Sequence, residues 1–165
     1  MESPFKIKIE PIQKKHMSKV IDMLQSISSY EPVKNQLDKI WESFITQNNV
    51  HPFVALLGNK QQHDPVFMRH NGEFVRTGDV VGYGSIVIEK KIRGSTMGHI
   101  EDVVSDENFR AIGAGRAIID HLIGIAKQEK CYKINLNCTE GNIGFYEKCG
   151  FKLNSVAMTI FKNVI

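Results

Sequence analysis

The sequence has no uninterrupted apolar run approaching the roughly 18 to 20 residues needed to cross a bilayer, so we expect no membrane span. It also lacks low-complexity tracts and any internal repeat at a period of about 20 to 50 residues. With 42% hydrophobic residues among 165, the chain is too apolar to be disordered. A single domain over residues 1–165 is therefore expected.

The chain carries little net charge. The 21 Lys and Arg residues against 18 Asp and Glu residues give a formal charge of +3. The first 19 residues hold five lysines and two glutamates, and 5 − 2 = +3 accounts for the whole surplus. Because the remainder is neutral, the composition argues against a nucleic-acid partner.

The chain has only three cysteines, and their spacing shows no paired motif. Cys131, Cys138 and Cys149 form an odd set without a CxxC pair, and the start of the chain shows no apolar secretory segment. These features predict reduced thiols and a cytoplasmic protein, with Cys138 and Cys149 in the core. No Cys/His spacing suits zinc and no His-Glu-x-x-His occurs, so no metal is expected.

Hydrophobic periodicity changes several times along the chain, and the pattern indicates an α+β fold. A mixed, mostly antiparallel central sheet flanked by helices is expected. Asn71-Gly72 predicts a hairpin turn between short strands at 66–68 and 73–75. The helices are expected at 16–27, 37–45, 114–130 and 142–149, and the other strands at 5–9, 53–57, 80–89, 98–105, 134–138 and 151–161.

The most informative segment runs from a strand through glycines into a helix, at residues 101–116. Glycines leave backbone N–H groups unshielded at a helix start, where the helix dipole adds partial positive charge, so an anion such as a diphosphate could bind there. The alternative is that the glycines only fit a tight turn. A Walker loop is excluded because the chain has no Gly-Lys dipeptide, and a dinucleotide fingerprint because Ile118 replaces the third glycine.

Several motifs resemble a known family. Residues 110–115, Arg-Ala-Ile-Gly-Ala-Gly, match the Arg/Gln-x-x-Gly-x-Gly/Ala motif of the GCN5-related N-acetyltransferase (GNAT) superfamily. Gly-His-Ile-Glu-Asp-Val at 98–103, Cys-Tyr-Lys-Ile at 131–134 and Asn-Ile-Gly-Phe-Tyr-Glu-Lys-Cys-Gly-Phe at 142–151 are more specific. With these motifs in this order, the chain resembles the eukaryotic glucosamine 6-phosphate N-acetyltransferases from about residue 80 onward.

The resemblance implies a GNAT fold and an enzyme that moves the acetyl group of acetyl-CoA to the 2-amine of glucosamine 6-phosphate, giving N-acetylglucosamine 6-phosphate for UDP-N-acetylglucosamine synthesis. It also implies a homodimer. The strand after the Glu-Asp pair would hold pantetheine and acetyl, the glycine-rich loop the pyrophosphate, and Tyr146 would lie near the thioester sulfur. The implied cofactor residues are Val103, Val104, Ser105, Arg110, Ala111, Ile112, Gly113, Ala114, Gly115, Arg116, Asn142, Tyr146, Glu147 and Lys148.

The resemblance places the acceptor on other residues. A basic turn, the Glu-Asp pair, a Tyr-Lys pair and one hydroxyl near the sugar are implied. The acceptor residues are Ser28, Lys91, Ile92, Arg93, Gly94, Glu101, Asp102, Val103, Tyr132, Lys133 and Asn137, and the catalytic set is Tyr146, Glu101, Asp102 and Asn137.

Elementary chemistry supports this assignment. A sugar phosphate carries about −1.5 to −2 charge near pH 7, which Lys91, Arg93 and Lys133 could neutralise, although these cations could also only solvate a hairpin end. Strand alternation predicts that Glu101 and Asp102 point to opposite faces, so that one addresses the sugar. Direct attack on the thioester needs an oxyanion donor, for example the Val103 N–H, and a proton donor for the thiolate, for example the Tyr146 phenol.

Two positions depart from the family pattern. Asn137 stands where the family usually has an acidic residue, and a neutral amide cannot act as a base, so the backbone carbonyl there or Glu101 would do that work. The last strand lacks the family's Arg for the phosphate and offers Lys162 instead. Two alternatives stay open: an acetyl-CoA-dependent enzyme for a protein or peptide amine, and a non-catalytic CoA-binding module.

Overall fold

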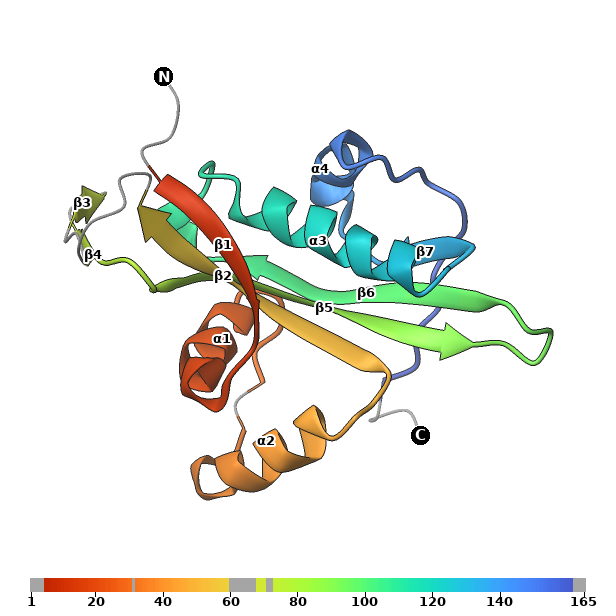
Figure 1. Ribbon diagram of the computed structural model, residues 1–165, viewed down its shortest axis with the longest axis horizontal. Helices are drawn as coiled ribbons and strands as arrows, with labels where there is room; N and C mark the ends of the chain where they lie inside the picture. Colours follow the sequence, from red (N-terminus) through yellow and green to blue (C-terminus); the bar gives the residue numbers. More distant parts are fainter. Residues whose placement is uncertain (1–4, 31, 60–67, 71–72, 162–165) are drawn as a thin grey trace.

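The computed structural model describes residues 5–30, 32–59, 68–70 and 73–161, and its core is one mixed sheet (Figure 1). The strand order is β1-β2-β5-β6-β7, and every neighbouring pair is antiparallel except β6 and β7, which are parallel. Two further short strands form a separate hairpin. The strands are β1 (Phe5–Pro11), β2 (Val50–Asn59), β3 (Met68–His70), β4 (Glu73–Val75), β5 (Val80–Lys90), β6 (Thr96–Ser105) and β7 (Lys133–Leu136).

Helices cover both faces of the sheet. In Figure 1, α1 (Met17–Leu24) and α2 (Leu37–Ile45) lie on one face, and α3 (Ala114–Gln128) and α4 (Ile143–Lys148) on the other. Each face has its own apolar core, as expected for a sheet buried between two layers. The expected α+β fold with a mostly antiparallel sheet flanked by helices is confirmed. No helix in the described part of the chain is long and apolar enough to cross a membrane.

The packing of α3 on β5 depends on two glycines. A Cβ at Gly82 or Gly84 would lie 2.9 or 2.6 Å from the Ile118 side chain, closer than side chains pack. Ile118 is fully buried, together with Leu122 and Ile86. The glycines therefore allow α3 to approach the sheet closely, which fixes the position of the helix start.

Strand β6 carries a bulge at its centre. Tyr83 pairs with Val104 and Ser85 with Glu101, so Asp102 and Val103 together oppose the single residue Gly84. Asp102 has a φ of 56°, in the left-handed region that aspartate tolerates better than most residues. The bulge breaks the alternation of side chains along the strand.

The bulge makes one prediction wrong. Cross-strand partners share a face, so Glu101 lies on the face of Ser85 and Tyr83, which α1 covers. Asp102 lines a cavity on that same face. Glu101 and Asp102 are therefore on one face rather than on opposite faces, because the extra residue resets the alternation.

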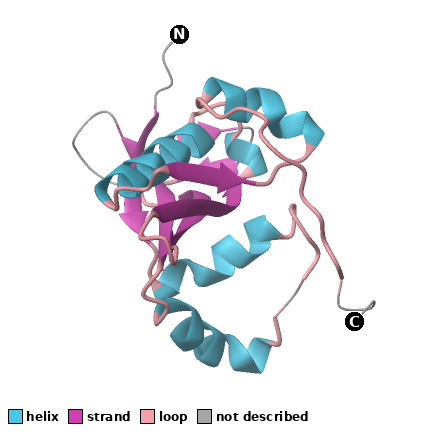
Figure 2. Cartoon of the chain, turned by 90° about the vertical axis from the view of Figure 1, so that its right-hand side faces the viewer, coloured by secondary structure: helices cyan, strands magenta, loops and turns pink. Residues whose placement is uncertain are grey.

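The expected strand at 151–161 is also wrong. These residues have no regular secondary structure and leave the body as a loop (Figure 2). A strand needs a neighbouring backbone to pair with, and no described residue of this chain provides one there. Cys138, expected in the core, is exposed because it follows the end of β7, whereas Cys149 is buried. The Asn71-Gly72 turn and Lys162 lie outside the described residues.

Candidate active site

The edge of β6 opens where β7 stops. The parallel pairing of β6 with β7 ends at Ile100 and Leu136, but β6 continues to Ser105. Among the described residues, no strand pairs with β6 on this side beyond Ile100. Backbone N–H and C=O groups along Val103 to Ser105 are thus available to an extended ligand, as adding a strand to a sheet edge requires.

The start of α3 follows this open edge after a short turn. Gly113 is the N-cap in the left-handed region, with φ 91°, and no side chain caps the helix. The first helical bond runs from the Ala117 N–H to the Gly113 carbonyl, so the three preceding N–H groups have no partner within the helix. This arrangement fits an anion held by backbone N–H groups.

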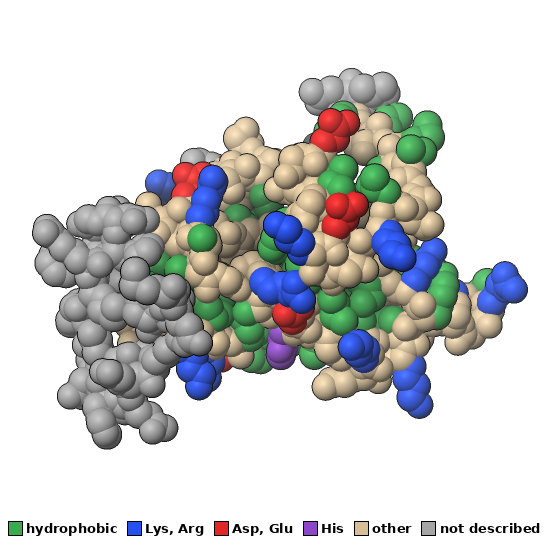
Figure 3. Space-filling model, turned by 90° about the horizontal axis from the view of Figure 1, so that it is seen from above, with side chains coloured by type: hydrophobic (Ala, Val, Ile, Leu, Met, Phe, Trp, Pro, Cys, Tyr) green, Lys and Arg blue, Asp and Glu red, His purple; other side chains and the backbone are tan. Residues whose placement is uncertain are grey.

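A short turn leads into that helix start. Asp106 is buried, accepts a hydrogen bond from the Asn108 N–H at 2.9 Å and forms an ion pair with Lys19. Arg110, a predicted cofactor residue, pairs with Glu107 at 3.1 Å on the surface. Figure 3 looks onto this side of the molecule and shows Lys and Arg side chains distributed over it, with Asp and Glu side chains among them.

Arg116 ties α3 to α4. Its Nε lies 2.9 Å from both carboxylate oxygens of Asp120, and its Nη1 donates to the Lys148 carbonyl at 2.7 Å. The guanidinium is therefore engaged within the protein. Sequence reasoning expected the Arg116 side chain at the pyrophosphate. In the structure, this side chain instead links α3 to the C-terminal end of α4, the helix that carries Tyr146.

Tyr146 is the most buried of the predicted catalytic residues, at 9% exposed. Its ring packs edge-on against Phe145 and Phe151, with ring centroids 5.0 and 6.1 Å away. The hydroxyl has no hydrogen-bond partner among the described residues, and burial raises its pKa above the ordinary value. A protonated phenol without a partner is suited to donate its proton to a ligand.

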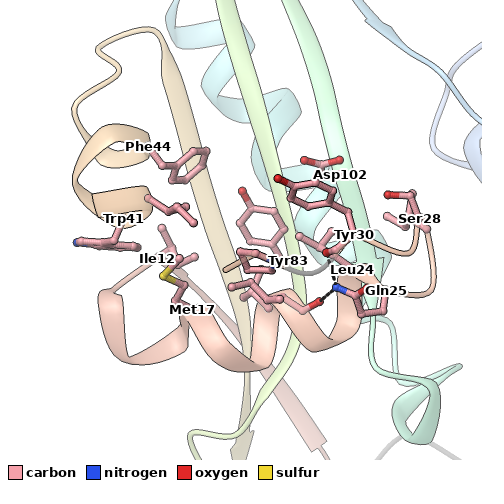
Figure 4. Close-up of a pocket in the computed structure, with 15 residues that line it drawn as sticks. Ile12, Met17, Leu24, Gln25, Ser28, Tyr30, Trp41, Phe44, Tyr83 and Asp102 are labelled. Atoms are coloured by element: carbon pink, nitrogen blue, oxygen red, sulfur yellow. Dashed lines mark hydrogen bonds between the residues drawn. The ribbon is translucent and has the colours of Figure 1, made fainter. Parts of the chain in front are cut away.

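Two of the predicted acceptor residues meet at a cavity on the other face of the sheet. Ser28, after α1, and Asp102, on β6, both line it (Figure 4). Tyr83 also lines the cavity, and burial raises the pKa of its phenol to about 12. The structure therefore brings two predicted site residues together across the α1 side of the sheet. Sequence reasoning missed Tyr83, because a tyrosine in an apolar strand shows no signal of function.

The basic turn at residues 91–94 contacts Glu89, a residue that sequence reasoning did not assign to the site. Lys91 Nζ lies 2.6 Å from one oxygen of Glu89, whose other oxygen lies 2.8 Å from His99 Nε2. Both interactions lower the pKa of Glu89, the Lys91 hydrogen bond more strongly. The β5–β6 register places residues 89 and 99 on one face, and the sequence alone does not determine that register.

The two other predicted phosphate cations are less constrained. Lys133 Nζ lies 5.5 Å from the centre of the Tyr132 ring, and the backbone of Lys133 pairs with Met97 beside Glu89. Arg93 is exposed in the turn closed by Gly94, with φ 86°, and forms no ion pair with a described residue. All three cations therefore lie at one end of the sheet.

Several other predicted residues are on the surface. Asn137 follows β7 directly and is exposed, as are Ile92, Asn142, Glu147 and Lys148. No group of three His, Cys, Asp or Glu residues in the described ranges could hold a metal ion.

A family comparison decides the class of this site. Residues 24–151 match the family model described as "Acetyltransferase (GNAT) family", which spans the open β6 edge, the α3 start and Tyr146. The chain belongs to the GNAT family. GNAT proteins use acetyl-CoA.

Relatives with curated names are similar over part of their length. A protein named glucosamine 6-phosphate N-acetyltransferase 1 from Dictyostelium discoideum is 41% identical over 104 residues, 62% of this chain and 66% of that protein. A glucosamine 6-phosphate N-acetyltransferase from Trypanosoma brucei brucei is 41% identical over 86 residues, covering 51% and 58%. The chain thus spans under two thirds of the length of these GNAT relatives.

Solved structures agree with this fold over nearly the whole chain. The crystal structure of glucosamine-6-phosphate N-acetyltransferase from Arabidopsis thaliana superposes with a TM-score of 0.75 at 26% identity, covering 95% of this chain and 99% of that one. A Trypanosoma brucei acetyltransferase gives 0.75 at 27% identity, covering 94% and 99%. The GNAT fold expected from the sequence is confirmed.

Proposed function

We propose that this GNAT protein transfers the acetyl group of acetyl-CoA to the 2-amine of glucosamine 6-phosphate. The observation that supports it most is the open edge of β6 beyond Ile100, which a short turn connects to an uncapped helix start. The first feature suits pantetheine and the second suits a pyrophosphate. The relatives named above carry this activity in their names.

In the proposed reaction, the thioester lies along β6. The Val103 N–H stabilises the oxyanion that forms on the thioester carbonyl, since a fixed donor costs no reorganisation there. The sugar amine forms the new C–N bond to give this oxyanion, and the C–S bond breaks as the oxyanion collapses to the amide carbonyl. Tyr146 gives its phenol proton to the departing thiolate and regains a proton from water, and its raised pKa keeps that proton in place at neutral pH before the reaction.

The acceptor amine must lose protons before and during attack. Glu101 and Asp102 lie on the same face, next to the bulge, and are the carboxylates that this role requires. The Asn137 amide is neutral and cannot take a proton, so in this proposal it only orients the amine, through its side chain or its backbone carbonyl. Lys91, Arg93 and Lys133 hold the phosphate.

The test is an acetyl-CoA assay across amino sugars with and without the 6-phosphate. Saturable CoA release is expected with glucosamine 6-phosphate and little with glucosamine. Equal rates with both sugars would contradict the phosphate site, and CoA binding without transfer to any sugar would favour a non-catalytic module. A peptide panel with faster turnover would instead favour a protein acceptor.

Lys133→Ala gives a sharper test of the phosphate site. We expect the KM for glucosamine 6-phosphate to rise about tenfold or more, with the KM for acetyl-CoA unchanged, because one charge-assisted contact is lost. Lys127→Ala, at an exposed lysine late in α3, is the matched control and should change neither constant.

The proposal also includes a cytoplasmic homodimer.

A further inference from the structure

Helix α4, which carries Tyr146, is short and depends on how its C-terminal end is held. It spans the six residues Ile143–Lys148, and helices of this length are marginal on their own. Gly150 follows the helix in the left-handed region, with φ 95°. Its N–H donates to the Glu147 carbonyl at 2.9 Å, and the Phe151 N–H donates to the Tyr146 carbonyl at 3.1 Å. These two bonds form a Schellman motif, which fixes the backbone of Tyr146.

The Schellman motif leaves one carbonyl of the last turn open. No backbone N–H among the described residues donates to the Lys148 carbonyl. Arg116 makes this bond instead, with its Nη1 at 2.7 Å, and a cation there also suits the partial negative charge of a helix C-terminus. Asp120 holds the guanidinium from the other side, because both of its carboxylate oxygens lie 2.9 Å from the Arg116 Nε. Arg116 is therefore a C-terminal cap of α4 that α3 provides.

The first turn of α3 contacts α4 at a second point. A Cβ on Gly115 would lie 3.4 Å from the Phe145 ring, so this ring packs over the bare backbone beside Arg116. Phe145 in turn packs edge-on against Tyr146, with ring centroids 5.0 Å apart. The turn of α3 that carries the unpaired N–H groups therefore also sets the position of the helix of Tyr146.

We propose that Arg116 is a positioning residue for Tyr146. It caps the end of α4 so that the phenol keeps its place at the thioester sulfur, and it is not a side-chain ligand of the pyrophosphate. The proposal rests on the acetyl transfer proposed above, in which Tyr146 protonates the departing thiolate. The Arg116 and Asp120 side chains are 50% and 52% exposed, so their ion pair contributes little to global stability. Loss of Arg116 should therefore act on α4 and much less on the melting temperature.

Hydrogen exchange measured by NMR tests the hold on α4 without any catalysis. The Cys149 and Phe151 amides both donate to the Tyr146 carbonyl. In Arg116→Ala these two amides should exchange roughly fivefold faster or more, because the end of the helix opens more often. Amides in the centre of β5 should keep the parent rate. Parent rates at both amides of the α4 end would overturn the proposal.

Arg76→Ala is the matched control for the loss of a surface ion pair. Arg76 is exposed after β4 and pairs with Asp79 at 3.3 Å, so this variant also removes a guanidinium from a carboxylate. It should change neither the exchange rates at the end of α4 nor the kinetic constants. The same acceleration in Arg76→Ala as in Arg116→Ala would show a general loosening of the fold and would overturn the role of the cap.

A double-mutant cycle with Tyr146→Phe tests the catalytic consequence. Arg116→Ala should lower kcat about tenfold in the parent but less than about twofold in Tyr146→Phe, which has no phenol to misplace. The KM for acetyl-CoA should stay unchanged. Equal losses of kcat in both backgrounds, or a raised KM for acetyl-CoA, contradict the proposal. If glucosamine 6-phosphate is not acetylated, the proposed function fails, and the exchange rates still decide whether Arg116 holds the helix of Tyr146.

Discussion

At the scale of single residues, Tyr146 combines burial with an unpartnered hydroxyl, and this makes its role testable. Tyr146→Phe keeps the ring and its packing against Phe145 and Phe151 but removes the proton. If the phenol protonates the thiolate, kcat should fall about 100-fold or more while the KM for acetyl-CoA changes little. Steady-state kinetics measure both constants, and an unchanged kcat would show that the thiolate leaves without this phenol.

His121 gives a prediction about pH. Its Nε2 is buried without a hydrogen-bond partner among the residues that the structure describes, its ring contacts Phe53 with centroids 4.3 Å apart, and burial lowers its pKa. The folded chain therefore binds this proton less readily than the unfolded chain. The free energy of unfolding should fall as the pH drops below the ordinary value of 6.5.

His121→Phe should remove part of that loss, because phenylalanine has no proton to bind and no polar atom to bury. Melting temperatures at pH 7.5 and 5.5 should differ by less in the variant than in the parent. His16, whose pKa is also lowered by burial, accounts for a remaining difference. An identical pH dependence in both proteins would mean that His121 does not couple protonation to folding.

At the scale of elements, the start of α3 requires a residue in the left-handed backbone conformation at position 113. Gly113 has φ 91°, and an added Cβ would meet no atom within 4 Å, so an effect of Gly113→Ala comes from the backbone alone. The variant should destabilise the fold by about 1 kcal/mol and raise the KM for acetyl-CoA, since alanine disfavours this conformation.

Gly124→Ala is the matched control within the same helix. Gly124 also has open space around it but ordinary helical dihedrals, so alanine should stabilise the fold by roughly 0.5–1 kcal/mol. Chemical denaturation measures both changes. If the free energy of unfolding changes in the same direction in both variants, then the left-handed conformation is not the reason for glycine at position 113.

Periodicity and turn chemistry were sufficient to predict most elements, because each helix and strand buries a face of its own. The spacing of Leu37, Ile40 and Phe44 locates α2 correctly. The bulge at Asp102 could not be predicted, since it depends on how β5 and β6 pair around Gly84. The Glu89–His99 contact likewise depends on the register of the β5–β6 hairpin. The hydrogen bond of Arg116 depends on the position of the distant end of α4.

At the scale of the whole molecule, the proposed reaction divides its groups between the two faces of the sheet. The α3 and α4 side presents backbone donors and Tyr146, while the α1 and α2 side presents Asp102 and a cavity. Acetyl donor and acceptor would meet only at β6, which contributes residues to both faces. The bulge is the feature that joins them, because it opens the backbone and turns both acidic side chains to the acceptor side.

The segment after α4 leaves a large apolar surface uncovered, and this predicts self-association. Val156 and Met158 are 90% and 94% exposed, and Leu153, Ile160 and Phe161 are also exposed. An extended apolar segment of this length is stabilised when it pairs with another sheet edge, which a second copy provides. Sedimentation should therefore give twice the 18.7 kDa chain mass at micromolar concentration.

Met158→Asp should shift that mass toward the monomer, because a charge in the interface must be desolvated. Val33→Asp changes an exposed apolar residue before α2 and should leave the dimer intact. If both variants keep the mass of a dimer, then another surface holds the two copies together. If the parent sediments as a monomer, the segment after α4 is not an interface, and the site must function within one chain.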